Sequence, residues 1–319
     1  MAKLKLTLAC DRYAYLQPLR EGRVQAEGLD INFLTVSGGI RHRRMYAHGE
    51  YDASEFSVSS YVVARGKGID WLDAIPFFPR RIFCHEFCFL RAGSDVEQPS
   101  DLKGRKFGLP DYETTSAVMI KGIFMHDYKL SLEDVTWVCI SDDMVGSAVP
   151  SGVTVERRTG VRFDELLRSG EIEGALDPHP PEAWLRSKGP VQRLFPDYLE
   201  EERRHYGRAK IFPIMHTVVI KREILKREPW VASSLFDALS ESRKRAYAEA
   251  ERQPLHLGLA WGASYFEQER ASFGRDPYAQ GLKANRHDLE TLLQFSQEQG
   301  LLARPLTPDE LFTPNVRET

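Results

Sequence analysis

The segment YDASEFSVSSYVVARG, residues 51–66, decides the fold class of this chain of 319 residues. Its first half reads as a short strand end, and three serines then stand where a helix begins, at Ser57, Ser59 and Ser60. A second segment, FGLPDYETTSAVMIKG at residues 107–122, repeats the order of short strand, hydroxyl side chains and helix. Helix starts of this kind suit an anion, although plain capping explains each of them equally well. One in each half of the chain indicates two lobes around a small anionic ligand.

Strands and helices alternate along most of the chain. Apolar and β-branched runs predict strands, and capping side chains before apolar runs predict helices. The expected strands are residues 3–9, 29–34, 51–56, 69–78, 82–90, 135–140, 174–177 and 212–221, and the expected helices begin near residues 41, 57, 114 and 163 and fill most of the chain beyond 227. This alternation predicts an α/β fold with mainly parallel sheets. The length fits two lobes of about 100 to 200 residues each.

The composition is that of an ordinary globular protein. Hydrophobic residues make up 42% and charged residues 28% of the chain. Because 43 basic residues are balanced by 46 acidic ones, for a net charge of −3, no nucleic-acid partner is expected. The basic run at residues 41–44 is interpreted as a solvated helix face, since Glu50, Asp52 and Glu55 follow it.

Location and redox state are predicted from the apolar runs and the cysteines. There is no run of about eighteen apolar residues, so no membrane contact is expected. The apolar stretch before Cys10 is too short for a signal-peptide core, which predicts a cytoplasmic protein. Together with Cys84, Cys88 and Cys139, this cysteine is expected to be reduced and buried. The run Cys84-His85-x-x-Cys88 lacks the second ligand pair of a zinc site, so no metal is expected.

Motifs of several enzyme classes are missing. No glycine-rich phosphate loop follows a strand, so a nucleotide-binding fold has no support. No Gly-x-Ser-x-Gly turn marks a serine hydrolase, and no His-Glu-x-x-His helix marks a metalloprotease.

Two arginines link predicted strands, at Arg80 and Arg81. Their planar guanidinium groups suit carboxylates. Placement on the surface, or pairing with Glu86, is the alternative. The aromatic neighbours Phe78 and Phe83 favour at least one arginine that points inward.

Other candidates lie at predicted strand ends. His216 stands in an apolar strand at an expected crossing between lobes, where a buried structural role and a functional role are equally supported. Asp177 begins a rigid loop, and His179 in that loop is interpreted as exposed. Glu55 directly precedes a helix start and suits a phenol or a proton transfer.

Several runs of the sequence resemble 4,5-dihydroxyphthalate decarboxylases. They are residues 212–216 (FPIMH), 101–106 with 108–112, 55–61, 78–81, and the tail around 285–312. The resemblance covers nearly the whole chain. The N-terminal loop at residues 11–16 departs from the Tyr-Asp-x-Thr pattern of the family, which leaves the exact substrate open.

The resemblance implies a two-lobed type II periplasmic-binding-protein-like clamshell with the ligand cleft between the lobes. Residues 1–90 and 216–319 would form lobe one, and residues 91–215 would form lobe two. It also implies an enzyme without an organic cofactor that acts on a small aromatic dicarboxylate. A homo-oligomer is expected.

The chemistry implied is loss of carbon dioxide from a hydroxylated benzene dicarboxylate, most simply 4,5-dihydroxyphthalate to protocatechuate. Such a reaction needs a base near the phenol, a proton donor at the ring and cations for the retained carboxylate. The predicted catalytic residues are His85, His216 and Glu55, and the predicted substrate-binding residues are Arg80, Arg81, Arg12, Ser57, Ser60, Tyr112, Thr114, Thr115 and Asp177. A non-catalytic solute-binding protein would share the fold and is the alternative. An enzyme of pyrimidine or thiamine biosynthesis is a third possibility, for which no cysteine-rich or histidine-donating site is identified.

Overall fold

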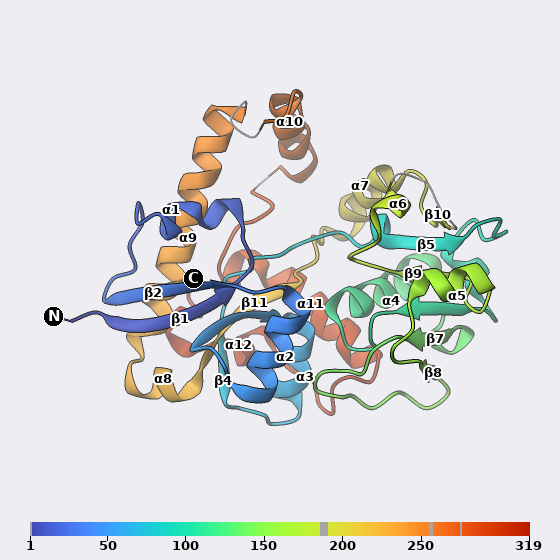
Figure 1. The fold of residues 1–319 in the computed structure, drawn as a ribbon, viewed down its shortest axis with the longest axis horizontal. Helices are drawn as coiled ribbons and strands as arrows, with labels where there is room; N and C mark the ends of the chain where they lie inside the picture. The colour runs from blue at the N-terminus through green and yellow to red at the C-terminus, as the bar shows by residue number, and fades with distance from the viewer. Residues whose placement is uncertain (1, 186–190, 255–257, 275) are drawn as a thin grey trace.

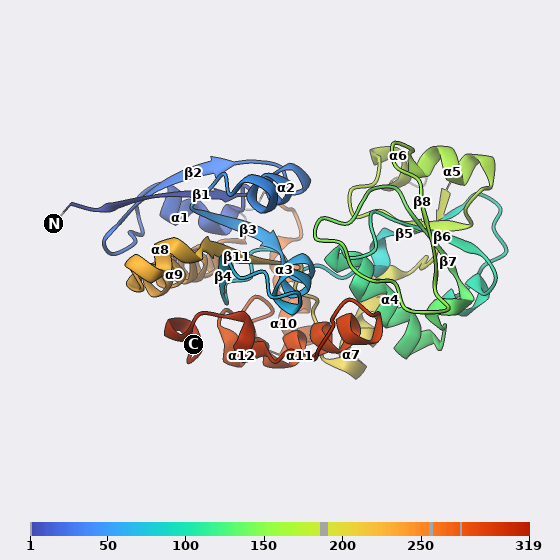
Figure 2. The ribbon, with the colours of Figure 1, turned by 90° about the horizontal axis from the view of Figure 1, so that it is seen from below.

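The computed structural model describes residues 2–185, 191–254, 258–274 and 276–319. Each of its two lobes is built on a β-sheet with helices packed around it (Figures 1 and 2). The chain ends lie on the same lobe, so this lobe is made from both ends of the sequence.

Lobe one holds a five-stranded sheet. Its order is β2 (Leu29–Thr35), β1 (Leu4–Cys10), β3 (Ala53–Ser57), β11 (His216–Lys221) and β4 (Leu72–Ile75). The first three strands pair in parallel, and β11 runs antiparallel to both of its neighbours.

Lobe two holds a six-stranded sheet. Its order is β10 (Val191–Arg193), β5 (Cys88–Arg91), β9 (Gly174–Leu176), β6 (Lys106–Leu109), β7 (Thr136–Cys139) and β8 (Thr154–Arg157). Here β5 is the strand that runs antiparallel to both neighbours. The short strands β8 and β10 carry weak patterns and were not predicted.

Both sheets are mixed for the same reason. The antiparallel strands β5 and β11 are the first strands after the chain crosses into lobe two and after it returns. Five of the nine strand pairings in the described residues are parallel, so the prediction of mainly parallel sheets holds only narrowly.

The two crossing segments touch through a bridge between Arg81 and Ile214. Residues 212–215 therefore belong to the crossing, and the predicted strand begins only at His216.

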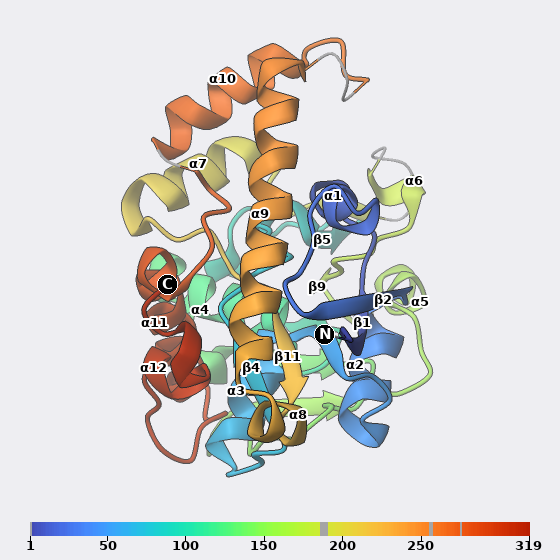
Figure 3. The ribbon, with the colours of Figure 1, turned by 90° about the vertical axis from the view of Figure 1, so that its left-hand side faces the viewer.

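The helices cover the sheets in both lobes. Lobe one has α1 (Gln17–Arg20), α2 (Gly38–His48), α3 (Val58–Gly66), α8 (Arg222–Arg227), α9 (Trp230–Arg252), α10 (Gly262–Phe273), α11 (Leu282–Glu298) and α12 (Pro308–Leu311), and lobe two has α4 (Thr115–Tyr128), α5 (Phe163–Ser169), α6 (Glu182–Leu185) and α7 (Tyr198–Ala209). Short 3-10 turns lie at Ala14–Leu16, His85–Phe87, Pro99–Leu102, Leu132–Asp134 and Pro314–Val316. The long helix α9 extends well beyond the sheet, and α10 lies at its far end (Figure 3).

Helix α11 ties the two lobes together. It follows lobe one in the chain, yet it packs against α4 of lobe two. Gly122 makes room for this contact, since a Cβ atom there would lie 2.1 Å from the ring of Phe295. The side chain of Gln299 donates a hydrogen bond of 2.8 Å to the Val118 carbonyl. The larger of two apolar clusters therefore runs through both lobes, and the smaller one lies within lobe two.

All four cysteines are unpaired and buried, as predicted. Among the helices that the structure describes, none has the length and apolar character to span a bilayer.

Candidate functional site

A cavity of about 450 Å³ opens between the lobes. Lobe one contributes the first turns of α2 and α3 and the residues Arg80 and His216. Lobe two contributes the segments that follow β6, β7, β8 and β9. The carboxyl ends of strands are where open α/β sheets bind ligands. The volume suits one small molecule.

Seven of the predicted site residues line this cavity. They are Arg80, His216, Ser57, Ser60, Thr114, Thr115 and Asp177. They come from both lobes, so residues far apart in the sequence converge on one space.

The predicted residue Arg81 lies outside the cavity. Successive side chains of an extended segment point in opposite directions, so Arg80 faces the cavity while Arg81 points into the protein. There its guanidinium lies 3.0 Å from the Asp288 carboxylate and donates to the Asn285 side chain at 2.5 Å. A substrate-binding role for Arg81 is therefore corrected to a structural one.

Three further predicted residues also lie away from the cavity lining. His85 is fully buried, with its ring against Phe195 and His205. Tyr112 is buried, with the Lys121 ammonium 3.1 Å from its ring centre, and Arg12 is an exposed loop residue. None of these three residues lines the cavity, so the prediction that they bind the ligand gains no support from the structure.

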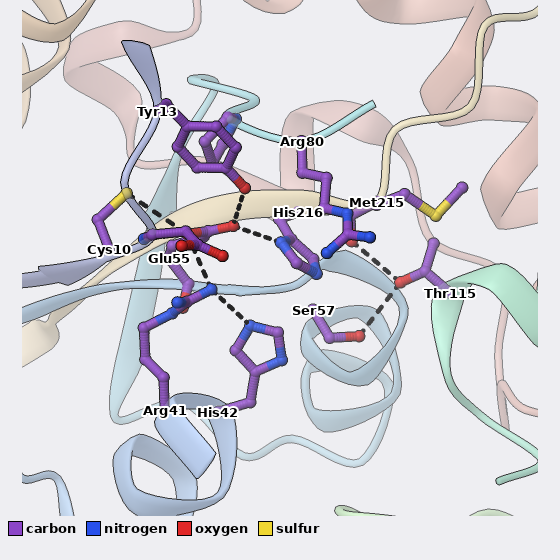
Figure 4. Close-up of polar contacts among 12 residues, drawn as sticks. Cys10, Tyr13, Arg41, His42, Glu55, Ser57, Arg80, Thr115, Met215 and His216 are labelled. Carbon is purple, nitrogen blue, oxygen red and sulfur yellow. Dashed lines mark hydrogen bonds and ion pairs between the residues drawn. The ribbon is translucent and has the colours of Figure 1, made fainter. Parts of the chain in front are cut away.

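Glu55 lies directly behind the cavity, fully buried in the middle of β3. Its carboxylate accepts hydrogen bonds from Tyr13 at 2.6 Å and from the Asp11 N–H at 2.9 Å, and pairs with Arg41 at 2.8 Å (Figure 4). Burial alone would raise the pKa of Glu55, but His216, Arg41 and Tyr13 hold it well below its usual range. The group therefore stays ionised, and it acts on the cavity only through the residues that it holds.

His216 connects this carboxylate to the cavity. Its Nδ1 lies 2.5 Å from Glu55, while the opposite edge of the ring faces the cavity (Figure 4). Burial lowers the pKa of His216 below its ordinary value, although the Glu55 carboxylate opposes this shift. A neutral imidazole held in this way can accept a proton from a ligand.

The interpretation of residues 41–44 as a solvated helix face is wrong for the first two of them. Arg41 is fully buried beneath α2. Besides pairing with Glu55, its guanidinium donates to the Val36 carbonyl at 2.5 Å and to the His42 ring at 3.3 Å. His42 lines the cavity, with its ring centre 4.7 Å from that of His216. One signal was available, since Arg41 and the buried Met45 are four residues apart and share a helix face.

The two predicted helix starts differ in what they offer a ligand. The Thr115 hydroxyl lies 3.1 Å from the Ser57 hydroxyl and 3.2 Å from the Ser59 N–H, so the start of α3 is occupied by contacts between lobes. At the start of α4, the N–H groups of Thr115 and Ser116 make no hydrogen bond within the described part of the chain. This second helix start can receive a carboxylate.

Polar groups complete the wall formed by lobe two. Arg80 contacts His179 at 3.5 Å, and the N–H of His179 is held by Asp177 at 2.9 Å. Arg162 also lines the cavity and was missed by the sequence analysis. Burial raises the pKa of the cavity-lining Asp111 to about 6. In the described residues, no group of three or more His, Cys, Asp or Glu side chains is placed to hold a metal ion.

One known protein matches this chain over its full length. A 4,5-dihydroxyphthalate decarboxylase from Comamonas testosteroni is 30% identical, and the match covers 100% of this chain and 99% of the relative. The chain belongs to the 4,5-dihydroxyphthalate decarboxylase family. A second decarboxylase of that name, from Pseudomonas putida, is 31% identical across 62% of this chain and 79% of its own length.

Two further comparisons, with a family model and with a solved structure, extend beyond the decarboxylase family to which this chain belongs. Residues 21–156 match the family model described as NMT1/THI5 like. The periplasmic aliphatic sulphonate binding protein SsuA from Escherichia coli has a similar structure, with a TM-score of 0.57, 13% identity and coverage of 97% of this chain and 92% of its own. The fold is therefore the predicted periplasmic-binding-protein-like clamshell.

Proposed function

We propose that this protein decarboxylates a benzene dicarboxylate that carries a hydroxyl group para to the leaving carboxylate. We expect the substrate to be 4,5-dihydroxyphthalate, which is named for the two relatives, and the product to be protocatechuate. The observation that carries the proposal is the pair of Glu55 and His216, a buried anion that holds a neutral imidazole against the cavity.

The ligand's orientation follows from where the charges lie. Its carboxylates lie towards the start of α4, with the Thr115 and Ser116 N–H groups, and towards Arg80. The hydroxyl group para to the leaving carboxylate is then placed against His216, on the wall formed by lobe one. This arrangement satisfies both ends of the molecule across the two lobes.

The reaction starts at the hydroxyl group. His216 takes the hydroxyl proton at Nε2, and the electron pair of the O–H bond moves into the ring. The ring carbon that bears the leaving carboxylate takes a proton, for which Asp111 is the candidate donor because its pKa is about 6. A dienone results.

Carbon dioxide leaves in the second step. The bond between the ring and the carboxylate breaks, its electron pair restores the aromatic ring, and the oxygen regains its proton from His216. Asp111 is reprotonated by solvent, so one proton is consumed for each carbon dioxide released. Apolar wall residues at Ile140, Phe163 and Trp184 disfavour the charged leaving carboxylate relative to the neutral carbon dioxide that it becomes.

Solute binding without catalysis is the second candidate, and the likeness to a sulphonate-binding protein favours it. Binding of an anion needs donors and cations, and the helix start and Arg80 supply both. It does not need a buried carboxylate that holds a histidine, which is why we prefer the enzyme.

The test is incubation of the purified protein with phthalates that carry hydroxyl groups at different positions, with carbon dioxide release as the measurement. We expect release only where a hydroxyl group is para to a carboxylate, and loss of release in His216→Gln. His48→Gln, at the exposed end of α2, is the matched control and should keep full activity. Binding of these acids by the wild-type protein without any release would reject the decarboxylase and support the solute-binding protein.

A further inference from the structure

We propose that His42 is a specificity-determining residue of the same cavity. Its Nδ1–H would donate to a second oxygen substituent, on the ring carbon next to the one whose hydroxyl group His216 deprotonates. The two histidines would then recognise a pair of adjacent oxygens on one ring. The inference rests on the proposed function, which it extends to a residue with no role in the mechanism above.

The contact with Glu55 determines which nitrogen of His216 carries the proton. An ionised carboxylate can only accept hydrogen bonds, so Nδ1 of His216 must be the donor at 2.5 Å. In the neutral ring Nε2 then has no proton. His216 therefore presents a lone pair to the cavity.

The contact with Arg41 determines which nitrogen of His42 carries the proton. A guanidinium group can only donate, so Nε2 of His42 must accept the hydrogen bond at 3.3 Å. The proton of the neutral ring is then on Nδ1. Figure 4 shows this nitrogen on the side of the ring that faces Ser57, away from Arg41. His42 therefore presents an N–H group to the cavity, on the same wall where His216 presents a lone pair.

One buried anion fixes both rings. Glu55 binds His216 directly, and it binds Arg41, which in turn binds His42. Arg41 is itself fully buried, with a further bond to the Glu55 backbone carbonyl at 3.1 Å. The contacts with Glu55 therefore fix the orientation of the Arg41 guanidinium. Because this group binds Nε2 of His42, Nδ1 is the nitrogen that remains for a ligand.

A donor beside an acceptor matches two adjacent hydroxyl groups. One hydroxyl donates to Nε2 of His216, and the neighbouring oxygen accepts from Nδ1 of His42. The ring centres are 4.7 Å apart and the rings are perpendicular, so both can approach the same end of a planar ligand. A ligand that lacks the second oxygen leaves the His42 N–H without a partner, which lowers the rate of that ligand selectively.

The test compares two acids and three proteins. The acids are 4,5-dihydroxyphthalate and 4-hydroxyphthalate, which differ in the second hydroxyl group, and the proteins are the wild type, His42→Phe and His42→Asn. We expect the wild type to prefer the dihydroxy acid by about tenfold or more in kcat/KM. In His42→Phe that ratio should fall to about one, mainly through the dihydroxy acid, and in His42→Asn it should partly recover, because the amide N–H replaces Nδ1–H.

A preference that is the same in His42→Phe as in the wild type would overturn the assignment. A general loss of folding would lower the rates for both acids equally, so the ratio separates specificity from structure. Nitrogen NMR of the histidine rings gives a second measurement, and a proton on Nε2 of His42 would also overturn it. If the wild type releases carbon dioxide from neither acid, the proposed function fails, and the same ratios measured as dissociation constants still decide the role of His42.

Discussion

Glu55 carries its negative charge without access to solvent, and five groups of lobe one contact its carboxylate: the Cys10 thiol, the Asp11 N–H, Tyr13, Arg41 and His216. Arg41 and His216 are the side chains through which this charge acts on the cavity. Removing one partner of a buried ion pair leaves the other uncompensated, which is far more costly than losing a pair on the surface. The cavity wall of lobe one therefore depends on this one carboxylate.

Glu55→Gln tests that dependence. We expect a loss of about 3–5 kcal/mol in the free energy of unfolding, because Arg41 keeps its charge without a carboxylate. Carbon dioxide release should fall by about a hundredfold or more, since His216 loses the group that fixes its proton. Urea unfolding and the release assay measure the two effects.

The control for this substitution is Glu50→Gln. Its carboxylate pairs with Arg44 at 3.3 Å on the surface, where both side chains are about half exposed. The expected change is below about 1 kcal/mol. Equal unfolding midpoints for the two variants would contradict the view that the Glu55 charge is structurally essential.

At the scale of residues, the sequence patterns were more successful in predicting the segments that reach the site than in predicting the individual side chains that face it. Arg80 and Arg81 are chemically identical neighbours, and only the direction of the extended backbone separates them. Arg41 resembles any exposed helix arginine until β3 brings Glu55 beneath it. Burial of a charge depends on partners distant in sequence, and a single sequence does not show these.

At the scale of elements, α4 contains a lysine with no access to solvent. Lys121 is fully buried, and its ammonium donates to the Tyr112 carbonyl at 2.9 Å. Burial lowers the pKa of Lys121 to about 7. In the unfolded chain the value is about 10.4. Between these two values the unfolded chain binds a proton that the folded protein releases, so this residue makes folding stability rise with pH.

Lys121→Met removes that contribution. The wild type should gain stability relative to the variant as pH rises from about 7 towards 10, by at most about 1.4 kcal/mol per pH unit. Urea unfolding of both proteins at pH 7, 8 and 9 measures the difference. Parallel stability curves would mean that the ammonium keeps its proton in the folded state.

The next residue of α4 fixes the contact with α11. In Gly122→Ala the new methyl group would lie within 2.1 Å of the Phe295 ring, so the helices must separate. We expect a loss of about 1–3 kcal/mol in the free energy of unfolding. Gly207→Ala in α7 is the matched control, because a Cβ there meets no atom within 4 Å. It should gain up to about 1 kcal/mol from helix propensity. Similar changes in both variants would argue against close packing between α4 and α11.

The elements themselves were largely predictable, because periodicity and capping are local. Both hydroxyl-rich helix starts form where predicted, with Ser57 and Thr114 as the N-cap residues. The strand predicted at residues 82–90 is shortened to β5, preceded by a turn at His85–Phe87. That turn belongs to the crossing between lobes, and nothing local in the apolar run marks where a strand gives way to a crossing.

At the scale of the whole molecule, the lobes are held by contacts on two sides. The Thr115 hydroxyl of lobe two bonds with Ser57 of lobe one and with the Met215 carbonyl of the crossing segment. Behind the cavity, Phe295 of α11 packs over Gly122 of α4. Hinged binding proteins close around their ligands by moving one domain against the other. The continuous core of this protein opposes such a movement.

We therefore expect the radius of gyration to stay the same when 4,5-dihydroxyphthalate saturates the cavity. Small-angle X-ray scattering of the free and the saturated protein measures it. Phe295→Ala removes the side chain that holds α11 against α4, so this variant should be larger without ligand and should contract when ligand binds. Contraction of the wild-type protein on binding would show that its lobes open and close, and would bring its behaviour nearer to that of a solute-binding protein.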